Sequence, residues 1–242
     1  MPLDTKKVVS TAGDSLSYPA EIRGQDIKSD SIFVIGGGHF GRRAVSILCE
    51  LGHESIFIVD RCEEALREFE RMPVKRFQED GVRFLERNLR QMRNENIIVP
   101  ALPVHLAFEW LRCRSAKGFT IEKMLFPETI ASLMPKFWHG KEGDLLVSYA
   151  DFLCPDDCPE PDRCTVTGEK REKPLFRYLS DIETREFDIF VIRSRQIAPG
   201  LGGYRVGDLL EAERAVRDGD GATWLIGTAC KCHGVISAFK VS

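Results

Sequence analysis

The sequence predicts an α/β fold, a doubly wound and mainly parallel Rossmann-like sheet with a cysteine-rich insertion. Three observations lead to this fold class. Short apolar runs typical of buried strands alternate with stretches of helical period, a glycine-rich loop joins the first run to the first helix, and cysteines gather in two late segments. Strands that alternate with helices are expected to lie parallel and to be joined by right-handed crossovers.

Four apolar runs in the first half of the chain predict four strands, with amphipathic helices between and after them. The strands are expected at residues 32–36, 55–60, 74–77 and 96–100. The helices are expected over residues 42–52, around Leu66 and Phe69, along Val82, Leu85 and Leu89, and along Val104, Ala107, Phe108 and Leu111. This alternation predicts βαβ units from residue 31 onward.

The second half of the chain carries three more strand-like runs, at residues 144–149, 187–193 and 223–227. A helix that begins near Asp208 and ends at Gly219 separates the last two. Residues 118–142 contain two prolines, and we expect short helices or a covering flap there.

The length of 242 residues suits one large α/β domain, or one domain with a small appendage. The expected organisation is an irregular arm over residues 1–29, a dinucleotide-binding half over 30–115, and a second α/β half over 116–242 that carries the cysteine clusters.

Composition and charge narrow the class of protein. The 34 basic and 37 acidic residues give a net charge of -3 without long blocks of one sign, so we expect no nucleic-acid partner. The N-terminal residues lack the apolar core of a signal peptide, and no segment approaches a membrane span, which predicts a cytoplasmic protein. In a reducing compartment, closely spaced cysteines indicate metal binding or thiol chemistry rather than disulfides.

The glycine loop, Gly36-Gly37-Gly38-His39-Phe40-Gly41, fits the G-x-G-x-x-G pattern between a predicted strand and a predicted helix. The first glycine of this pattern permits a tight turn, the second lets backbone approach a pyrophosphate, and the third lets helix and strand pack closely. The helix N-terminus adds backbone donors and the positive end of a dipole. The loop therefore predicts NAD(H) binding.

Asp60 ends the second predicted strand, at the position of the acid that accepts hydrogen bonds from an adenosine ribose. Its charge would repel a 2′-phosphate and so favours NAD over NADP. An alternative role is open, because Asp60 followed by Glu63 also looks like a helix cap.

Residues 31–110 resemble the TrkA N-terminal type of NAD-binding domain, also called the RCK domain, through VIGGGHFGRRAVSIL, FIVDR and the Glu79-Asp80 pair. The resemblance implies that Asp60 holds the ribose, that Asp80 lies near the adenosine, and that NAD(H) sensing is linked to potassium ion transport. The cysteine-bearing half matches nothing in that family. The glycine loop also looks like that of precorrin-2 dehydrogenase, where an acid at the position of Asp60 is not typical.

Six candidate metal ligands lie in two late clusters. They are Cys154, Cys158 and Cys164 in CPDDCPEPDRC, and Cys230, Cys232 and His233 in ACKCHG. The loops after two parallel strands leave the same sheet edge, so the clusters are expected to converge beside the nucleotide. Such a ligand set suits zinc or an iron–sulfur cluster, and the alternative is buried or incidental thiols.

Two further features are candidates with ordinary alternatives. Gly200, Gly202 and Gly203 could form a second anion-binding loop or merely a long connection. His105 and Glu109 lie four residues apart after the fourth strand, so they could form a catalytic acid–base pair, whereas lone histidines are more often structural.

The expected function is that of an NAD(H)-binding protein with a cysteine-ligated metal or iron–sulfur site, performing or sensing a redox step on an unknown small molecule. An NAD-dependent oxidoreductase is the enzymatic form of this hypothesis. The alternatives are a non-enzymatic TrkA-like regulatory subunit and a precorrin-2 dehydrogenase-like enzyme. The candidate partners are a small-molecule substrate or effector, a membrane transporter subunit, and a second copy of the chain in a homodimer.

Overall fold

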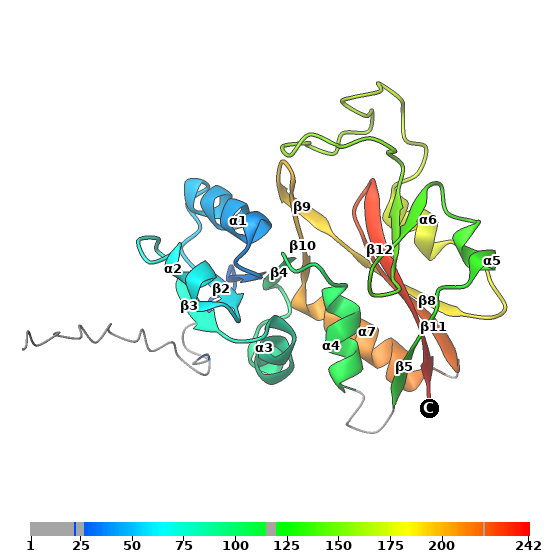
Figure 1. Cartoon of the computed structure of the whole chain (residues 1–242), viewed down its shortest axis with the longest axis horizontal. Coiled ribbons are helices and arrows are strands. Elements are labelled where there is room, and N and C mark those ends of the chain that lie inside the picture. Colours follow the sequence, from blue (N-terminus) through cyan, green and yellow to red (C-terminus); the bar gives the residue numbers. More distant parts are fainter. Residues whose placement is uncertain (1–21, 23–26, 115–119, 220) are drawn as a thin grey trace, which may run out of the picture.

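The computed structural model describes residues 22, 27–114, 120–219 and 221–242, which form a mixed α/β structure with two six-stranded sheets (Figure 1). Both sheets contain parallel and antiparallel pairs. The α/β class is therefore confirmed, but the expectation of a single, mainly parallel sheet is wrong. Most of the irregular arm expected over residues 1–29 lies outside the described residues.

The first sheet has the strand order β3-β2-β1-β4-β10-β9. Its strands are β1 Ile32–Ile35, β2 Ile56–Asp60, β3 Lys75–Gln78, β4 Ile97–Pro100, β9 Arg195–Ala198 and β10 Leu201–Arg205. The four strands from the first half of the chain are parallel, as predicted. The glycine-rich segment near residue 200 extends this sheet as an antiparallel hairpin, because β10 pairs with both β4 and β9.

Helices cover both faces of the parallel strands, which explains why those strands are almost continuously apolar. The helices of this half are α1 His39–Glu50, α2 Glu63–Arg67, α3 Gly81–Asn88, the short η2 Leu89–Gln91 and α4 Leu106–Arg114. On one face Ala44 and Leu48 of α1 pack with Val34. On the other face Phe84 of α3 packs with Phe33.

The second sheet has the order β6-β7-β12-β11-β8, and β5 also pairs with β12. Its strands are β5 Ile121–Met124, β6 Phe137–His139, β7 Leu145–Ser148, β8 Asp188–Arg193, β11 Thr223–Ala229 and β12 His233–Val241. Among the described strands of this sheet, only β8 and β11 pair in parallel. Two short helices, α5 Glu128–Ala131 and α6 Leu175–Ser180, contribute to its separate apolar cluster. The strands expected near residues 145, 188 and 223 are confirmed.

One apolar core joins the two sheets. It contains Phe33 and Phe57 from the first sheet together with Ile226 and Phe239 from the second. Helix α3 contributes to the same core, and so do α4 and α7, the last of which spans Val206–Asp218. Figure 1 shows α4 and α7 in the region between the sheets.

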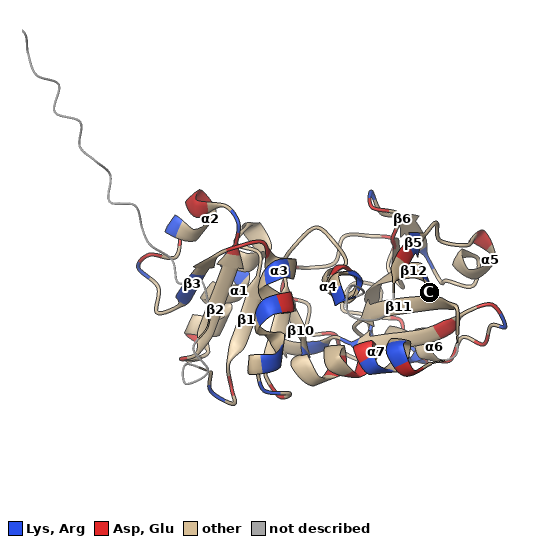
Figure 2. Ribbon diagram, turned by 90° about the horizontal axis from the view of Figure 1, so that it is seen from below, with Lys and Arg blue, Asp and Glu red and all other residues tan. Residues whose placement is uncertain are grey.

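Charged side chains of both signs are interspersed along α3 and α7 (Figure 2). Among the described residues, no helix has the length and apolar content needed to cross a bilayer.

A buried ion pair ties α4 to α7. Arg114 Nε lies 2.9 Å from Glu213 Oε1, and the two side chains are only 3% and 9% exposed. Removal of one partner would leave the other as an uncompensated charge in the core.

We expect Arg114→Met to lower the free energy of unfolding by about 3–5 kcal/mol, because Glu213 then stays buried without its partner. Urea denaturation would measure the change. The double variant Arg114→Met with Glu213→Leu is the control and should recover most of the loss. A single variant as stable as the wild type would contradict the structural role of this pair.

Candidate functional site

Two glycines of the glycine loop are required by the fold itself. Gly36 has φ +113°, and a Cβ there would lie 2.5 Å from the Ala101 carbonyl oxygen. At Gly41 a Cβ would lie 1.8 Å from the carbonyl oxygen of Gly36. Neither position accommodates a side chain, so these two glycines set the turn and the close packing of α1 on β1.

Gly38 differs from its neighbours because the protein itself does not require a glycine there. Its φ of -69° suits any residue, and a Cβ would meet nothing within 4 Å. It is also the N-cap of α1, without a side-chain cap. The space beside Gly38 therefore lies open at the N-terminus of a twelve-residue helix.

Asp60 lies at the end of β2, where backbone groups hold its carboxylate in place. Gly37 N donates to Oδ2 at 2.6 Å, and Cys62 N donates to Oδ1 at 2.8 Å. Cys62 is the N-cap residue of α2, whose first turn receives no side-chain cap. The bonds of Asp60 thus join the glycine loop to the connection after β2, and the side chain remains half-buried.

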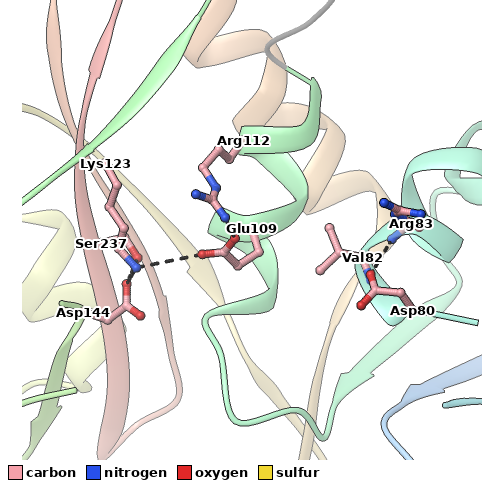
Figure 3. Close-up of polar contacts among 8 residues, drawn as sticks. All are labelled: Asp80, Val82, Arg83, Glu109, Arg112, Lys123, Asp144 and Ser237. Atoms are coloured by element: carbon pink, nitrogen blue, oxygen red, sulfur yellow. Dashed lines mark hydrogen bonds and ion pairs between the residues drawn. The ribbon is translucent and has the colours of Figure 1, made fainter. Parts of the chain in front are cut away.

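Asp80 has a structural role at the start of α3. Its Oδ1 accepts from Val82 N and Arg83 N, each at 3.1 Å, which makes it the N-cap of that helix (Figure 3). This side-chain cap satisfies two backbone donors that the helix cannot satisfy by itself.

A cleft of about 750 Å³ brings these residues together along the ends of the parallel strands. Its lining includes Gly38, Asp60, Asp80 and the segment 102–104 after β4. His39 and Phe40 do not line this cleft. Both are exposed, and Phe40 lines a neighbouring cavity.

The side chains of His105 and Glu109 bond to different partners. His105 is 2% exposed, and its Nδ1 lies 2.7 Å from Ser237 Oγ, which in turn donates to Asp144. Glu109 pairs with Arg112 and with Lys123, whose Nζ also lies 2.8 Å from Asp144 Oδ1 (Figure 3). The structure therefore does not bring the two side chains together as the predicted acid–base pair.

His105 is held neutral by its surroundings. Burial lowers the pKa of His105 from 6.5 to about 4, against the attraction of Asp144 and with a smaller contribution from Lys123. Its Nε2 is buried and has no hydrogen-bond partner among the described residues, and the same holds for the hydroxyl of Tyr204. The sequence carried no signal for the contact between His105 and Ser237, because the two residues lie 132 positions apart along the chain.

The two cysteine clusters meet on the second sheet. The cysteine loop, residues 149–174, joins β7 to α6, and the turn between β11 and β12 carries Cys230 and Cys232. Cys154 Sγ lies 3.4 Å from His233 Nε2, and Cys230 Sγ lies 3.9 Å from His233 Nδ1. Cys154 of the first cluster thus lies against His233 of the second, on the second sheet and not on the sheet that carries the glycine loop.

The thiols influence one another electrostatically. Burial raises the pKa of Cys154, and the nearby Cys158 and Cys164 raise it further. A hydrogen bond between Cys230 and Cys232 lowers the pKa of Cys232 and raises that of Cys230. Within the described ranges, however, no three His, Cys, Asp or Glu side chains are already arranged to hold a metal ion.

Arg43 of α1 ties the cysteine loop to the half of the chain that carries the glycine loop. Its guanidinium donates to the carbonyl oxygens of Asp156 and Gly200. Gly200 N donates to Cys158 O at 3.0 Å, and Gln196 Nε2 donates to the same oxygen at 2.8 Å. Figure 1 shows the cysteine loop, coloured yellow-green, passing over the tip of the β9–β10 hairpin.

The glycines near residue 200 have packing roles. Gly200 has φ +69°, and a Cβ there would lie 1.5 Å from Asp156 O. At Gly203 a Cβ would lie 2.7 Å from Ile98 O. Because the N–H of Gly200 already donates to Cys158, the hairpin supports the cysteine loop and does not offer that donor to an anion.

A second cavity connects the two candidate sites. It is lined by Arg43 and the hairpin on one side, and by Cys230 and His233 on the other. It shares Ala101, Leu102 and Pro103 with the cleft that contains Gly38 and Asp60. Cys230 and His233 of the second cluster therefore border a cavity that adjoins the cleft beside β4.

Residues 107–242 match the family described as "Uncharacterized protein, C-terminal domain", and the chain belongs to this family. An uncharacterized protein of Archaeoglobus fulgidus is 29% identical over 219 residues, which cover 86% of this chain and 98% of that protein. No solved structure matches the chain.

These findings correct the predicted family. The resemblance to the TrkA N-terminal or RCK domain over residues 31–110 is wrong, since the family match lies over residues 107–242 and belongs to a different family. The cysteine-bearing half is therefore part of a recognised domain. The link to potassium transport and the adenosine role of Asp80 depended on that resemblance and are withdrawn with it.

We expect stability to fall as the pH decreases from about 6.5 to about 4, because His105 takes up a proton in the unfolded chain but not in the core. The difference between these pKa values corresponds to about 3 kcal/mol of unfolding free energy, fully present above pH 6.5. Urea denaturation at several pH values would measure it. His105→Gln cannot titrate and should show a shallower decline, and equal slopes for both proteins would contradict the role of His105.

Proposed function

We propose that this family member binds NAD(H) through a Rossmann-like half and performs or senses a redox step beside a cysteine-ligated metal. The strand order β3-β2-β1-β4 with parallel pairing supports the first part. In sheets of this kind, nucleotides bind outside the carboxyl ends of the strands, at the point where the strand order reverses. Here that point lies between β1 and β4, beside the glycine loop.

The single observation that carries the proposal is the open space at Gly38. Gly36 and Gly41 are explained by the protein's own packing, whereas Gly38 meets no atom that a side chain would displace. A bound pyrophosphate would require this glycine, because its oxygens must approach the backbone N–H groups at the start of α1.

The position of Asp60 supports a nicotinamide dinucleotide without a 2′-phosphate. Its carboxylate lines the cleft and is held by Gly37 N and Cys62 N, so its orientation is fixed before any ligand binds. A fixed carboxylate accepts hydrogen bonds from the two ribose hydroxyls and repels an additional phosphate. We therefore propose that NADH binds more tightly than NADPH.

Ligand spacing supports the metal part of the proposal. A sulfur at about 2.3 Å and a nitrogen at about 2.0 Å from a tetrahedral zinc lie about 3.5 Å apart. Cys154 Sγ and His233 Nε2 are already 3.4 Å apart. A metal would need to draw in further thiolates from Cys158, Cys164, Cys230 or Cys232, and its binding energy would then hold the cysteine loop against β12.

Zinc and an iron–sulfur cluster both suit a thiolate-rich site, and they predict different functions. Zinc would act as a structural link between the cysteine loop and the second sheet, whereas a cluster would exchange electrons with the neighbouring nucleotide. A precorrin-2 dehydrogenase-like activity shares the nucleotide step and differs in its tetrapyrrole substrate. Metal and sulfide analysis after anaerobic purification separates the first two.

Gly38→Val should weaken NADH binding by roughly 100-fold, since the added side chain fills the space for the pyrophosphate. Calorimetric titration measures the affinity, and circular dichroism checks the fold. Gly36→Val is the matched control and should instead destabilise the protein, because of its positive φ and the contact with Ala101. Unchanged NADH affinity in folded Gly38→Val would place the nucleotide elsewhere.

Cys154→Ser and Cys230→Ser should each lower the bound metal per chain and the melting temperature, because the two clusters are expected to share one centre. Atomic emission of anaerobically purified protein measures zinc and iron. Cys62→Ser and Cys113→Ser alter exposed thiols outside both clusters and should leave the metal content unchanged. Wild-type protein that contains neither metal would refute the shared site.

A further inference from the structure

The second cavity, with a volume of about 700 Å³, offers a ligand few charged groups. Its lining is mainly apolar and includes Val99, Leu201 and Val235. Among the described residues that line it, Arg43 is the only Lys, Arg, Asp or Glu, and its guanidinium already donates to two carbonyl oxygens. A charge buried without a partner is strongly disfavoured, so this lining suits an uncharged ligand.

Two large apolar side chains at this cavity are exposed to solvent. Phe40 of α1 is 67% exposed, and Leu146 of β7 is 45% exposed. The first belongs to a helix that packs on the first sheet and the second to a strand of the second sheet, yet both line the same cavity. Exposed apolar side chains that gather around one depression mark a surface for an apolar ligand.

Hydroxyl groups replace apolar side chains where the core opens into this cavity. Ile192 and Ile226 are buried in the core that joins the sheets. Two residues farther along each segment, the same face carries Ser194 and Thr228, and both line the cavity. Ser194 follows β8 directly and continues its pairing, because its N–H donates to Ala229 O at 2.8 Å.

The hydroxyls of Ser194 and Thr228 are available to a ligand. Both side chains are half-buried and so retain accessible surface. Neither hydroxyl has a hydrogen-bond partner among the described residues. Each can therefore donate its hydrogen to a ligand oxygen without losing a bond inside the protein.

We propose that the second cavity binds an uncharged quinone, with its ring against the apolar lining and its carbonyl oxygens at the wall formed by Ser194 and Thr228. The apolar lining and the uncharged donors select an uncharged carbonyl compound. The choice of a quinone within that class rests on the proposed NAD(H) function, because a quinone becomes a hydroquinone by taking up the hydride of NADH and one proton. The residues that the cavity shares with the cleft of Gly38 and Asp60 would place the quinone beside the nucleotide.

The test uses the full-length protein without nucleotide, and duroquinone as the probe. Every carbon of the duroquinone ring is substituted, so the ring offers no open position to a thiol such as Cys230. Calorimetric titration measures its affinity. Tetramethylbenzoate has a similar apolar body and a negative charge, and it is the matched control. We expect duroquinone to bind roughly tenfold more tightly than tetramethylbenzoate, because the cavity offers little to offset a charge.

Thr228→Val and Ser194→Ala remove the hydroxyls and nearly preserve side-chain size. Each should weaken duroquinone binding roughly fivefold, the loss expected for one neutral hydrogen bond. A ligand held by apolar packing alone would bind both variants as tightly as the wild type or more tightly, and that result overturns the carbonyl contact. Circular dichroism checks the fold of each variant.

Phe40→Ala tests the apolar side of the cavity and should also weaken duroquinone binding. Its matched control is Leu51→Ala, which changes a comparably exposed apolar residue at the end of α1, outside the cavity lining. The control should leave the affinity unchanged. Equal affinities in the two variants would place the quinone elsewhere and overturn the inference.

A separate titration with NADH distinguishes this inference from the function on which the choice of a quinone rests. If NADH binds and duroquinone does not, the quinone site is overturned and the nucleotide site stands. If duroquinone binds with the expected dependence on Thr228 and NADH does not bind, the cavity site stands and the proposed function falls. Tetramethylbenzoate that binds as tightly as duroquinone also overturns the inference, because the ligand would then be an anion held by Arg43.

Discussion

The antiparallel pairing of β10 with β4 is the contact on which the candidate sites depend. It attaches the β9–β10 hairpin to the edge of four parallel strands, and Gly203 allows the close approach because a Cβ there would meet Ile98 O at 2.7 Å. The hairpin in turn carries Tyr204 to the second cavity and Gly200 to the cysteine loop. Without this pairing, neither the second cavity nor the cysteine loop would lie beside the cleft that contains Gly38 and Asp60.

The parts of the fold that could be predicted from the sequence are local. The strands β1 to β4 and the glycine loop are encoded in short segments whose pattern fits one structure, so their order and parallel pairing followed directly. Strand β10, Leu201–Arg205, was interpreted as a loop because its glycines suggested a turn. The strand β12 was missed, since Gly234 and Ser237 interrupt its apolar run and hide the strand signal.

The candidate sites likewise contain some contacts that the sequence predicted and others that it did not. The convergence of Cys154 with His233 was predicted from strands that leave one edge of a single sheet. In the structure β7 and β11 do run in the same direction, on either side of antiparallel β12, but they belong to the second sheet and not to the sheet of the glycine loop. His105 was noticed for its position after β4, and its partner Ser237 could not be identified because the contact joins segments 132 residues apart. Such contacts depend on how the two sheets pack, which no local pattern specifies.

The hydrogen bonds of the Arg43 guanidinium couple segments that lie far apart in the sequence. The guanidinium joins the helix that begins at the glycine loop to both the cysteine loop and the hairpin, through Asp156 O and Gly200 O. An event that orders the cysteine loop also restrains this helix, and an event that restrains the helix favours the ordered loop. Any such coupling would be reciprocal by linkage: a ligand bound beside the helix and a ligand bound by the cysteine loop would change each other's affinity by the same factor.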